Sequence, residues 1–176
     1  EPKMIQSRIV FISIIFIFIG FFTDPHETQA QEKQSGHWNY YCDDLEQRRH
    51  CEIAQKIQIE EKNLSFLIVF KKSKEKNSEI KENLYIITPL GVNLKKSLKI
   101  NFNKKTKYTQ SFNKCENYGC LVIFDKRLGM EYSLTNYNNM EISFYIDSVK
   151  EPVVLKLPIS GFAEALQKIN EELNKY

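Results

Sequence analysis

A two-residue alternation of apolar and polar side chains restricts the folds open to this chain more than any other feature. From 140 to 147 every even position is apolar, and polar residues or Tyr145 occupy the odd positions. Successive side chains of a β-strand point to opposite faces, so the alternation predicts strands with one buried face and one solvated face. Several such strands separated by polar turns predict a β-sandwich or a β-barrel. The same alternation recurs at 51–59, 98–103 and 153–159.

The stretch 64–70 departs from this pattern, because Leu67 and Val69 stand between its other apolar residues. We expect that strand to be covered on both faces. Beyond it, Lys71 to Asn83 is rich in Lys, Glu, Asn and Ser and is predicted to be a charged connector at a hairpin tip. A binding patch is the alternative for this connector and for the basic cluster Lys104, Lys105 and Lys107.

Only the end of the chain changes period. Apolar residues there recur three and four positions apart, which predicts a helix from Ser160 onward, with Ser160 as its N-cap and Glu164 in its early turns. This helix should pack its apolar stripe on an open end or edge of the sheet. A second short helical turn is predicted within 126–136. The stripe consists of Phe162, Leu166, Ile169 and Leu173.

The first thirty residues have the pattern of a secretory signal peptide. Lys3 and Arg8 precede a 14-residue apolar run, Ile9 to Phe22, and a polar segment ends at Ala30. A retained membrane anchor is the alternative, but fourteen helical residues span only about 21 Å of a hydrocarbon core about 30 Å thick. We therefore predict cleavage after Ala30, a flexible leader at 31–36 and one domain at 37–176.

Charge and composition exclude some classes of partner. The chain has 25 basic and 22 acidic residues, of which the segment 1–30 holds two basic and three acidic. The predicted mature chain therefore keeps 23 basic and 19 acidic residues, a formal charge of +4. Lys and Glu are mixed along the chain, which is not the charge pattern of a nucleic-acid-binding protein.

The four cysteines, Cys42, Cys51, Cys115 and Cys120, all follow the export signal. An even count in an exported chain predicts disulfides. Three pairings are open, and the local one, Cys42–Cys51 with Cys115–Cys120, is favoured because each pair brackets a short, turn-rich stretch. Zinc is the rival explanation, but spacings of nine and five do not match the usual two-residue knuckles.

The sequence holds little that predicts catalysis. The predicted mature chain has two histidines, His37 and His50, which we expect to be solvated loop residues. The minor alternative is a metal site formed by these histidines with Asp43 or Asp44. There is no phosphate-binding glycine loop, nucleophile elbow or calcium loop. We predict that the protein is not an enzyme and has no cofactor or metal. Trp38 is predicted to anchor the core, with an aromatic binding surface including Tyr40 and Tyr41 as the alternative.

Several segments together resemble the invasion-associated locus B family of exported bacterial proteins. The resemblance covers essentially the whole predicted mature chain and depends on the order and spacing of these segments rather than on any one of them. The residues that carry it are Trp38, Cys51 to Gln55, the turn Thr88-Pro89-Leu90-Gly91-Val92, Cys115 with Tyr118-Gly119-Cys120, and Leu157-Pro158-Ile159-Ser160-Gly161-Phe162 with Ala165.

Each of these segments has an adequate structural role. Pro89 presets a turn, and Gly91 and Gly119 permit backbone conformations that other residues avoid. The resemblance implies an immunoglobulin-like β-sandwich, periplasmic or outer-membrane-associated, and linked in some pathogens to entry into host cells. It implies a protein partner in the bacterial envelope or on the host surface. A periplasmic housekeeping or chaperone-like module is the alternative.

Overall fold

The computed structural model describes residues 33–35, 38–45, 47–59, 64–76, 78–103, 106–125, 129–147 and 149–176. The predicted signal peptide, His37, Lys104 and Lys105 lie outside these residues. Within the predicted leader, Lys33–Ser35 form a short strand, because their backbone pairs with residues 38–40.

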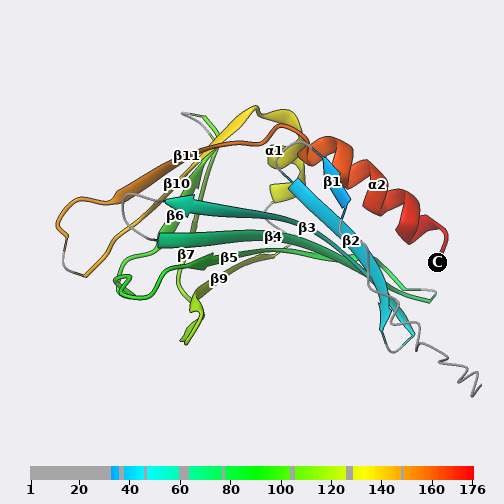
Figure 1. Ribbon diagram of the computed structural model, residues 1–176, viewed down its shortest axis with the longest axis horizontal. Coiled ribbons are helices and arrows are strands. Elements are labelled where there is room, and N and C mark those ends of the chain that lie inside the picture. Colours follow the sequence, from blue (N-terminus) through cyan, green and yellow to red (C-terminus); the bar gives the residue numbers. More distant parts are fainter. Residues whose placement is uncertain are drawn as a thin grey trace, which may run out of the picture.

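Two antiparallel sheets build the molecule (Figure 1). The first has seven strands in the order β1-β2-β3-β4-β5-β9-β8, and the second has four in the order β11-β10-β6-β7. The strands are β1 Lys33–Ser35, β2 Trp38–Leu45, β3 Arg48–Ile59, β4 Leu64–Glu75, β5 Lys81–Thr88, β6 Leu98–Asn101, β7 Lys107–Gln110, β8 Lys114–Glu116, β9 Gly119–Asp125, β10 Asn139–Phe144 and β11 Val153–Pro158; the helices are α1 Met130–Asn136 and α2 Phe162–Asn174.

The hydrophobic core lies on one face of the seven-stranded sheet. The four-stranded sheet and helix α2 together cover this face. The four-stranded sheet covers one part, where Phe66 of β4 stacks on Phe144 of β10 with ring centroids 5.8 Å apart. Helix α2 covers the other part, where Phe162 meets Trp38 at 5.2 Å and Phe70 at 5.4 Å, both edge to face. Figure 1 shows α2 lying over β1 and β2 while β10 and β11 lie at the other end. The predicted mostly-β sandwich with a C-terminal helix and two local disulfides is confirmed.

Both predicted helices are present, but the N-cap expected for the C-terminal helix is not. All four residues of the predicted α2 stripe are buried, and α1 falls within 126–136. The expectation that Ser160 caps α2 is wrong. Gly161 stands at the N-cap in the left-handed region with φ 90°, and a tight turn in which Phe162 N–H donates to Ile159 O at 3.1 Å precedes the helix. Because glycine adopts this conformation without a steric cost, the turn replaces a side-chain cap.

The expected connector at 71–83 is also shorter than predicted. Strand β4 continues to Glu75 and β5 begins at Lys81, so the link between them is 76–80. The charged residues extend along paired strands, where alternate positions face solvent and tolerate Lys and Glu.

Gly119 opens β9 at a point where the backbone of β5 passes very close. Its φ is 143°, and a Cβ there would meet the carbonyl oxygen of Thr88 and lie 2.8 Å from Cγ2 of Ile87. We expect Gly119→Ala to lower the free energy of unfolding by about 2 kcal/mol, through backbone strain and overpacking. Gly91→Ala is the matched control, since Gly91 also has positive φ (84°) but no atom lies within 4 Å of its Cβ position. Chemical denaturation of both variants tests this, and equal losses would contradict the steric explanation.

Candidate interaction surface

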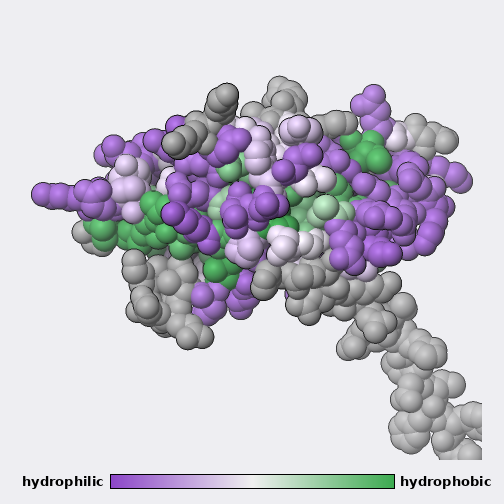
Figure 2. All heavy atoms as spheres, turned by 90° about the horizontal axis from the view of Figure 1, so that it is seen from above, coloured by the Kyte–Doolittle hydropathy of each residue, from purple (hydrophilic) through white to green (hydrophobic). Residues whose placement is uncertain are grey.

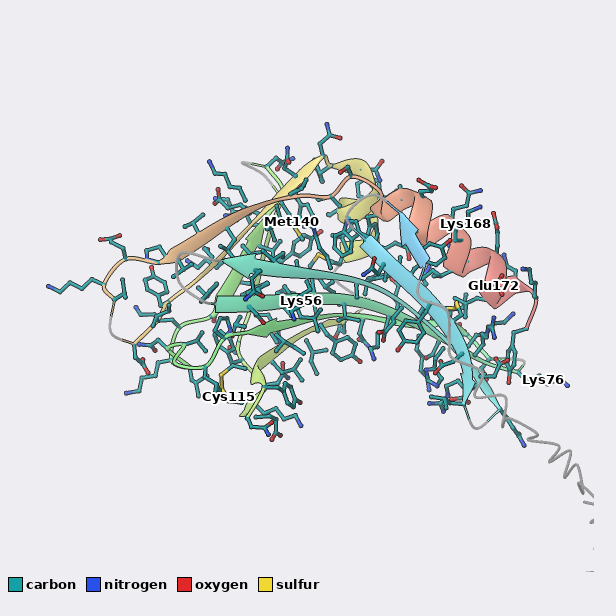
Figure 3. All side chains as sticks on the ribbon, viewed as in Figure 1. Lys56, Lys76, Cys115, Met140, Lys168 and Glu172 are labelled. Atoms are coloured by element: carbon teal, nitrogen blue, oxygen red, sulfur yellow. A yellow bond between two sulfur atoms is a disulfide. The ribbon has the colours of Figure 1, made fainter. Side chains whose placement is uncertain are left out.

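The two disulfides join directly opposed residues of neighbouring strands. Cys42 of β2 faces Cys51 of β3, with Cα atoms 4.1 Å apart. Cys115 of β8 faces Cys120 of β9, with Cα atoms 3.9 Å apart. The strand order puts β4 and β5 between these two hairpins, so the disulfides lie toward opposite edges of the seven-stranded sheet. In Figure 1 both hairpins extend below the sheet, one at each end, and Figure 3 labels Cys115 in one of them.

The family-like segments form two structural groups. In the first, Trp38, Gln55 and Phe162 are buried, and Phe162 of α2 packs on the fully buried Trp38. An aromatic binding surface that includes Trp38 is therefore excluded. Gly161 belongs to this group because it turns the chain into α2.

The second group joins the turn after β5 to the disulfide hairpin of β8 and β9. The Thr88 hydroxyl donates to the carbonyl of Cys120 at 3.2 Å and lies 3.3 Å from the carbonyl of Pro89. Gly91 accepts a hydrogen bond from the backbone N–H of Asp147 at 3.0 Å. A shallow hollow of about 540 Å³ lies beside this group, and Leu90, 55% exposed, stands at its border.

Groups that could support catalysis or hold a metal are sparse in the described residues. His50 faces Asp43 across β2 and β3. Among the residues that the structure places, no three His, Cys, Asp or Glu side chains come together as a metal site would require. No helix in that part of the chain has the length and apolar character to cross a membrane.

The outer face of the seven-stranded sheet, turned away from the core, carries an apolar patch. Strand register puts Ala54, Val69, Tyr85 and Ile123 in one row across β3, β4, β5 and β9. A second row beside it consists of Leu67, Ile87 and Leu121. We call these seven residues the apolar face: Ala54, Leu67, Val69, Tyr85, Ile87, Leu121 and Ile123.

The apolar face is separate from the hydrophobic core. Val69 is only 6% exposed, yet it is not part of the continuous core cluster, and the other six residues do not pack against that cluster. The ring contacts of Phe144 and Phe162 all reach the opposite face of the sheet. In Figure 1 the two helices and β10 and β11 lie above the sheet, so the apolar face is on its lower side, between the two disulfide hairpins.

Charged residues surround the apolar face. Lys71 pairs with Glu52 at 2.8 Å and also lies over the Tyr85 ring, 5.8 Å from its centroid. Lys56 and Lys114 flank the second row, opposite Leu67 and Leu121. An apolar centre with a charged rim is the usual composition of a protein–protein interface. Six of the seven residues are partly exposed and Val69 is buried, which makes the apolar face a candidate site of interaction.

Tyr41 belongs to the same rim. Partial burial, together with the nearby Glu52 and Asp43 carboxylates, raises the pKa of Tyr41 to about 12. The phenol therefore stays protonated at any physiological pH and can donate a hydrogen bond at the border of the apolar face.

The expectation that β4 is covered on both faces is confirmed only in part. On the outer face Val69 is 6% exposed, whereas Leu67 is only partly buried. The signal that would have identified the apolar face is the unbroken apolar run in three strands that prove to be neighbours: Phe66 to Phe70, Leu84 to Ile87 and Leu121 to Phe124.

Comparison with known proteins shows the family and the fold. The family model described as "Invasion associated locus B (IalB) protein" matches residues 38–170. The crystal structure of invasion associated protein b from Bartonella henselae superposes with a TM-score of 0.68 at 17% identity, covering 83% of this chain and 99% of that one. At that identity the similarity establishes the fold. The comparison with curated proteins gives no match. The family match, which spans most of the chain, confirms the resemblance inferred from the sequence segments: the chain belongs to the invasion associated locus B family of exported bacterial proteins.

Proposed function

We propose that the protein is a non-catalytic interaction protein of the bacterial envelope, periplasmic or associated with the outer membrane, and that its apolar face binds a protein partner. Adhesion, with help in entry into host cells, is the role that we propose for this binding. The observation that carries the proposal is the apolar face itself, with its seven residues in register on four adjacent strands and a charged rim. Burial of such a patch in a complex would remove it from water, which is the main favourable contribution to protein association.

A housekeeping role in the envelope is the second candidate. An open sheet face of Leu, Ile and Val accepts many apolar segments without close shape complementarity, which suits a chaperone-like module. The two roles use the same surface and differ in the partner.

A crosslinking pull-down compares them directly. The oxidised, tagged protein is incubated in parallel with native bacterial envelope and with host membranes. We expect Leu67→Lys with Ile87→Lys to reduce capture of the specific partner at least about thirtyfold, because two central apolar contacts become charges. Tyr132→Lys on α1 is the control, since Tyr132 is also a large exposed hydrophobic residue (68%) but belongs to neither the apolar face nor the four-stranded sheet. It should leave capture unchanged.

The outcomes separate the candidates. Specific capture of a host surface protein supports adhesion, and specific capture of bacterial envelope proteins alone supports housekeeping. Equal capture by the parent chain and the Leu67/Ile87 variant contradicts the apolar face as the site. A substrate turnover that disappears in His50→Ala would contradict the non-catalytic assignment.

A further inference from the structure

A second surface, on the four-stranded sheet, has the opposite character. Its outer face carries Lys99 on β6, Lys107 on β7 and Lys156 on β11, all exposed. Lys96, in the loop before β6, lies over the ring of Tyr145 with Nζ 5.5 Å from the centroid. We call these four residues the lysine face. Figure 2, which shows the molecule from above, has many hydrophilic residues on this side, with hydrophobic areas between them.

Strand register gives the lysine face a definite geometry. Lys156, Glu141, Asn101 and Lys107 occupy consecutive positions across β11, β10, β6 and β7. Neighbouring strands lie about 4.8 Å apart, so the backbones at Lys156 and Lys107, the two ends of this row, are about 14 Å from each other. Lys99 lies two residues along β6 from Asn101, so the positive charges are spread over an area rather than gathered at a point.

The positive charge on this face is not balanced by neighbouring acids. Glu141 is the one acidic residue of the row, and its Oε1 accepts a hydrogen bond from the Asn101 amide at 3.3 Å. Within the described residues none of the four lysines forms an ion pair. Of the 23 basic and 19 acidic side chains that follow the predicted signal peptide, four and one lie here, which leaves 19 basic and 18 acidic side chains elsewhere. This face therefore carries +3 of the formal charge of +4.

The centre of the face is an open hollow of about 620 Å³ suited to a hydroxyl-rich ligand. Its polar lining consists of Asn101, Asn103, Lys107, Asn139, Glu141 and Lys156, and Phe102 and Met140 complete it with apolar surface. An amide supplies both donors and acceptors, which matches the hydroxyl groups of a sugar. A surface that binds membranes presents large apolar side chains for insertion between lipids, whereas the exposed apolar residues of β11 here are Val154 and Pro158.

We propose that the lysine face binds an acidic polysaccharide, a chain of sugars with repeated sulfate, carboxylate or phosphate groups. Lysines about 14 Å apart contact several anionic groups of an extended chain at once, and the contacts reinforce one another because the groups are linked. The asparagine amides bind the hydroxyl groups between them. This site shares no residue with the apolar face, so its test and the pull-down succeed or fail separately.

Heparin, a highly sulfated polysaccharide, is the probe. We expect the oxidised protein to bind immobilised heparin with an affinity that falls as salt is added, because the charges are exposed. Lys99→Gln with Lys107→Gln and Lys156→Gln should raise the Kd at least about tenfold. The control is Lys76→Gln with Lys168→Gln and Lys175→Gln, three exposed lysines in the link after β4 and in or directly after α2; Figure 3 labels the first two. It removes the same charge and should change the Kd less than about twofold.

Several outcomes would overturn the proposal. Equal weakening in both triple variants means that heparin responds to net charge alone, and no binding by the parent protein means that the site is absent. Vesicles of phosphatidylglycerol and polyglutamate are run beside heparin. Stronger binding to either, lost in the lysine-face variant, assigns the face to a membrane or to an acidic protein instead. Equal binding to uncharged dextran rules out recognition by charge.

Discussion

Complete reduction of the two disulfides should lower the free energy of unfolding by about 4–5 kcal/mol. Each bond closes a short loop, with sequence separations of nine and five. Loops of that length restrict the unfolded chain by about 2–3 kcal/mol each. Since a single domain is stable by only about 5–15 kcal/mol, the reduced protein should be marginally stable. The melting temperature should fall by about 10–20 °C in reductant, measured by circular dichroism with free thiols counted.

Paired alanine variants separate the two bonds. Cys42→Ala with Cys51→Ala opens the longer loop and should cost slightly more than Cys115→Ala with Cys120→Ala. Cys51 and Cys120 are both 2% exposed, but Cys42 packs against the core whereas Cys115 is exposed, so the loss of packing adds to the difference. A melting temperature that does not change after complete reduction would contradict a structural role for the disulfides.

The local features of the fold follow from periodicity. Met140, Ile142 and Phe144 are buried on one face of β10, as their alternation with polar residues predicts. The C-terminal stripe from Phe162 to Leu173 likewise becomes the buried side of α2. These predictions succeed because the direction of a side chain depends only on its position within its own strand or helix.

The order of the strands does not follow from periodicity. β5 pairs with β9, more than thirty residues later in the chain, while β6 and β7 join the other sheet. The alternating pattern is the same in all of them, so it does not distinguish the two sheets. The start of α2 was misjudged for a related reason, because Ser160 is a good N-cap by residue type, whereas the turn geometry at Gly161 determines where the helix begins.

The candidate surfaces were harder to predict than the fold. The apolar face combines residues from Ala54 to Ile123 that no short motif connects, and it exists only in the strand order of the folded sheet. The lysine face has the same origin. Lys107 stood out in a basic cluster of the sequence, but Lys99 and Lys156 join it only through the pairing of β6, β10 and β11.

Lys72 is the residue whose single replacement should destabilise the protein most clearly through charge. It lies on the buried side of β4 and is 6% exposed. Its Nζ is 2.6 Å from Oε2 of Glu131 on α1, 3.8 Å from Oε2 of Glu82 on β5, and donates a hydrogen bond at 3.0 Å to Oδ1 of Asn170 on α2. One ammonium group thus connects both helices to the sheet. We expect Lys72→Ala to lower the free energy of unfolding by about 3 kcal/mol, because two carboxylates lose the cation between them.

The neighbouring residue supplies the control. Lys71 pairs with Glu52 on the outer face but is half exposed, so Lys71→Ala should cost less than about 1 kcal/mol. Trp38, the one tryptophan of the chain, contacts Phe162 of α2, and its fluorescence therefore reports the docking of that helix during denaturation. If Lys72 holds the helices through charge, Glu131→Gln should restore part of the stability lost in Lys72→Met, since it removes one of the uncompensated carboxylates. Equal losses in Lys71→Ala and Lys72→Ala would mean that packing alone holds the helices.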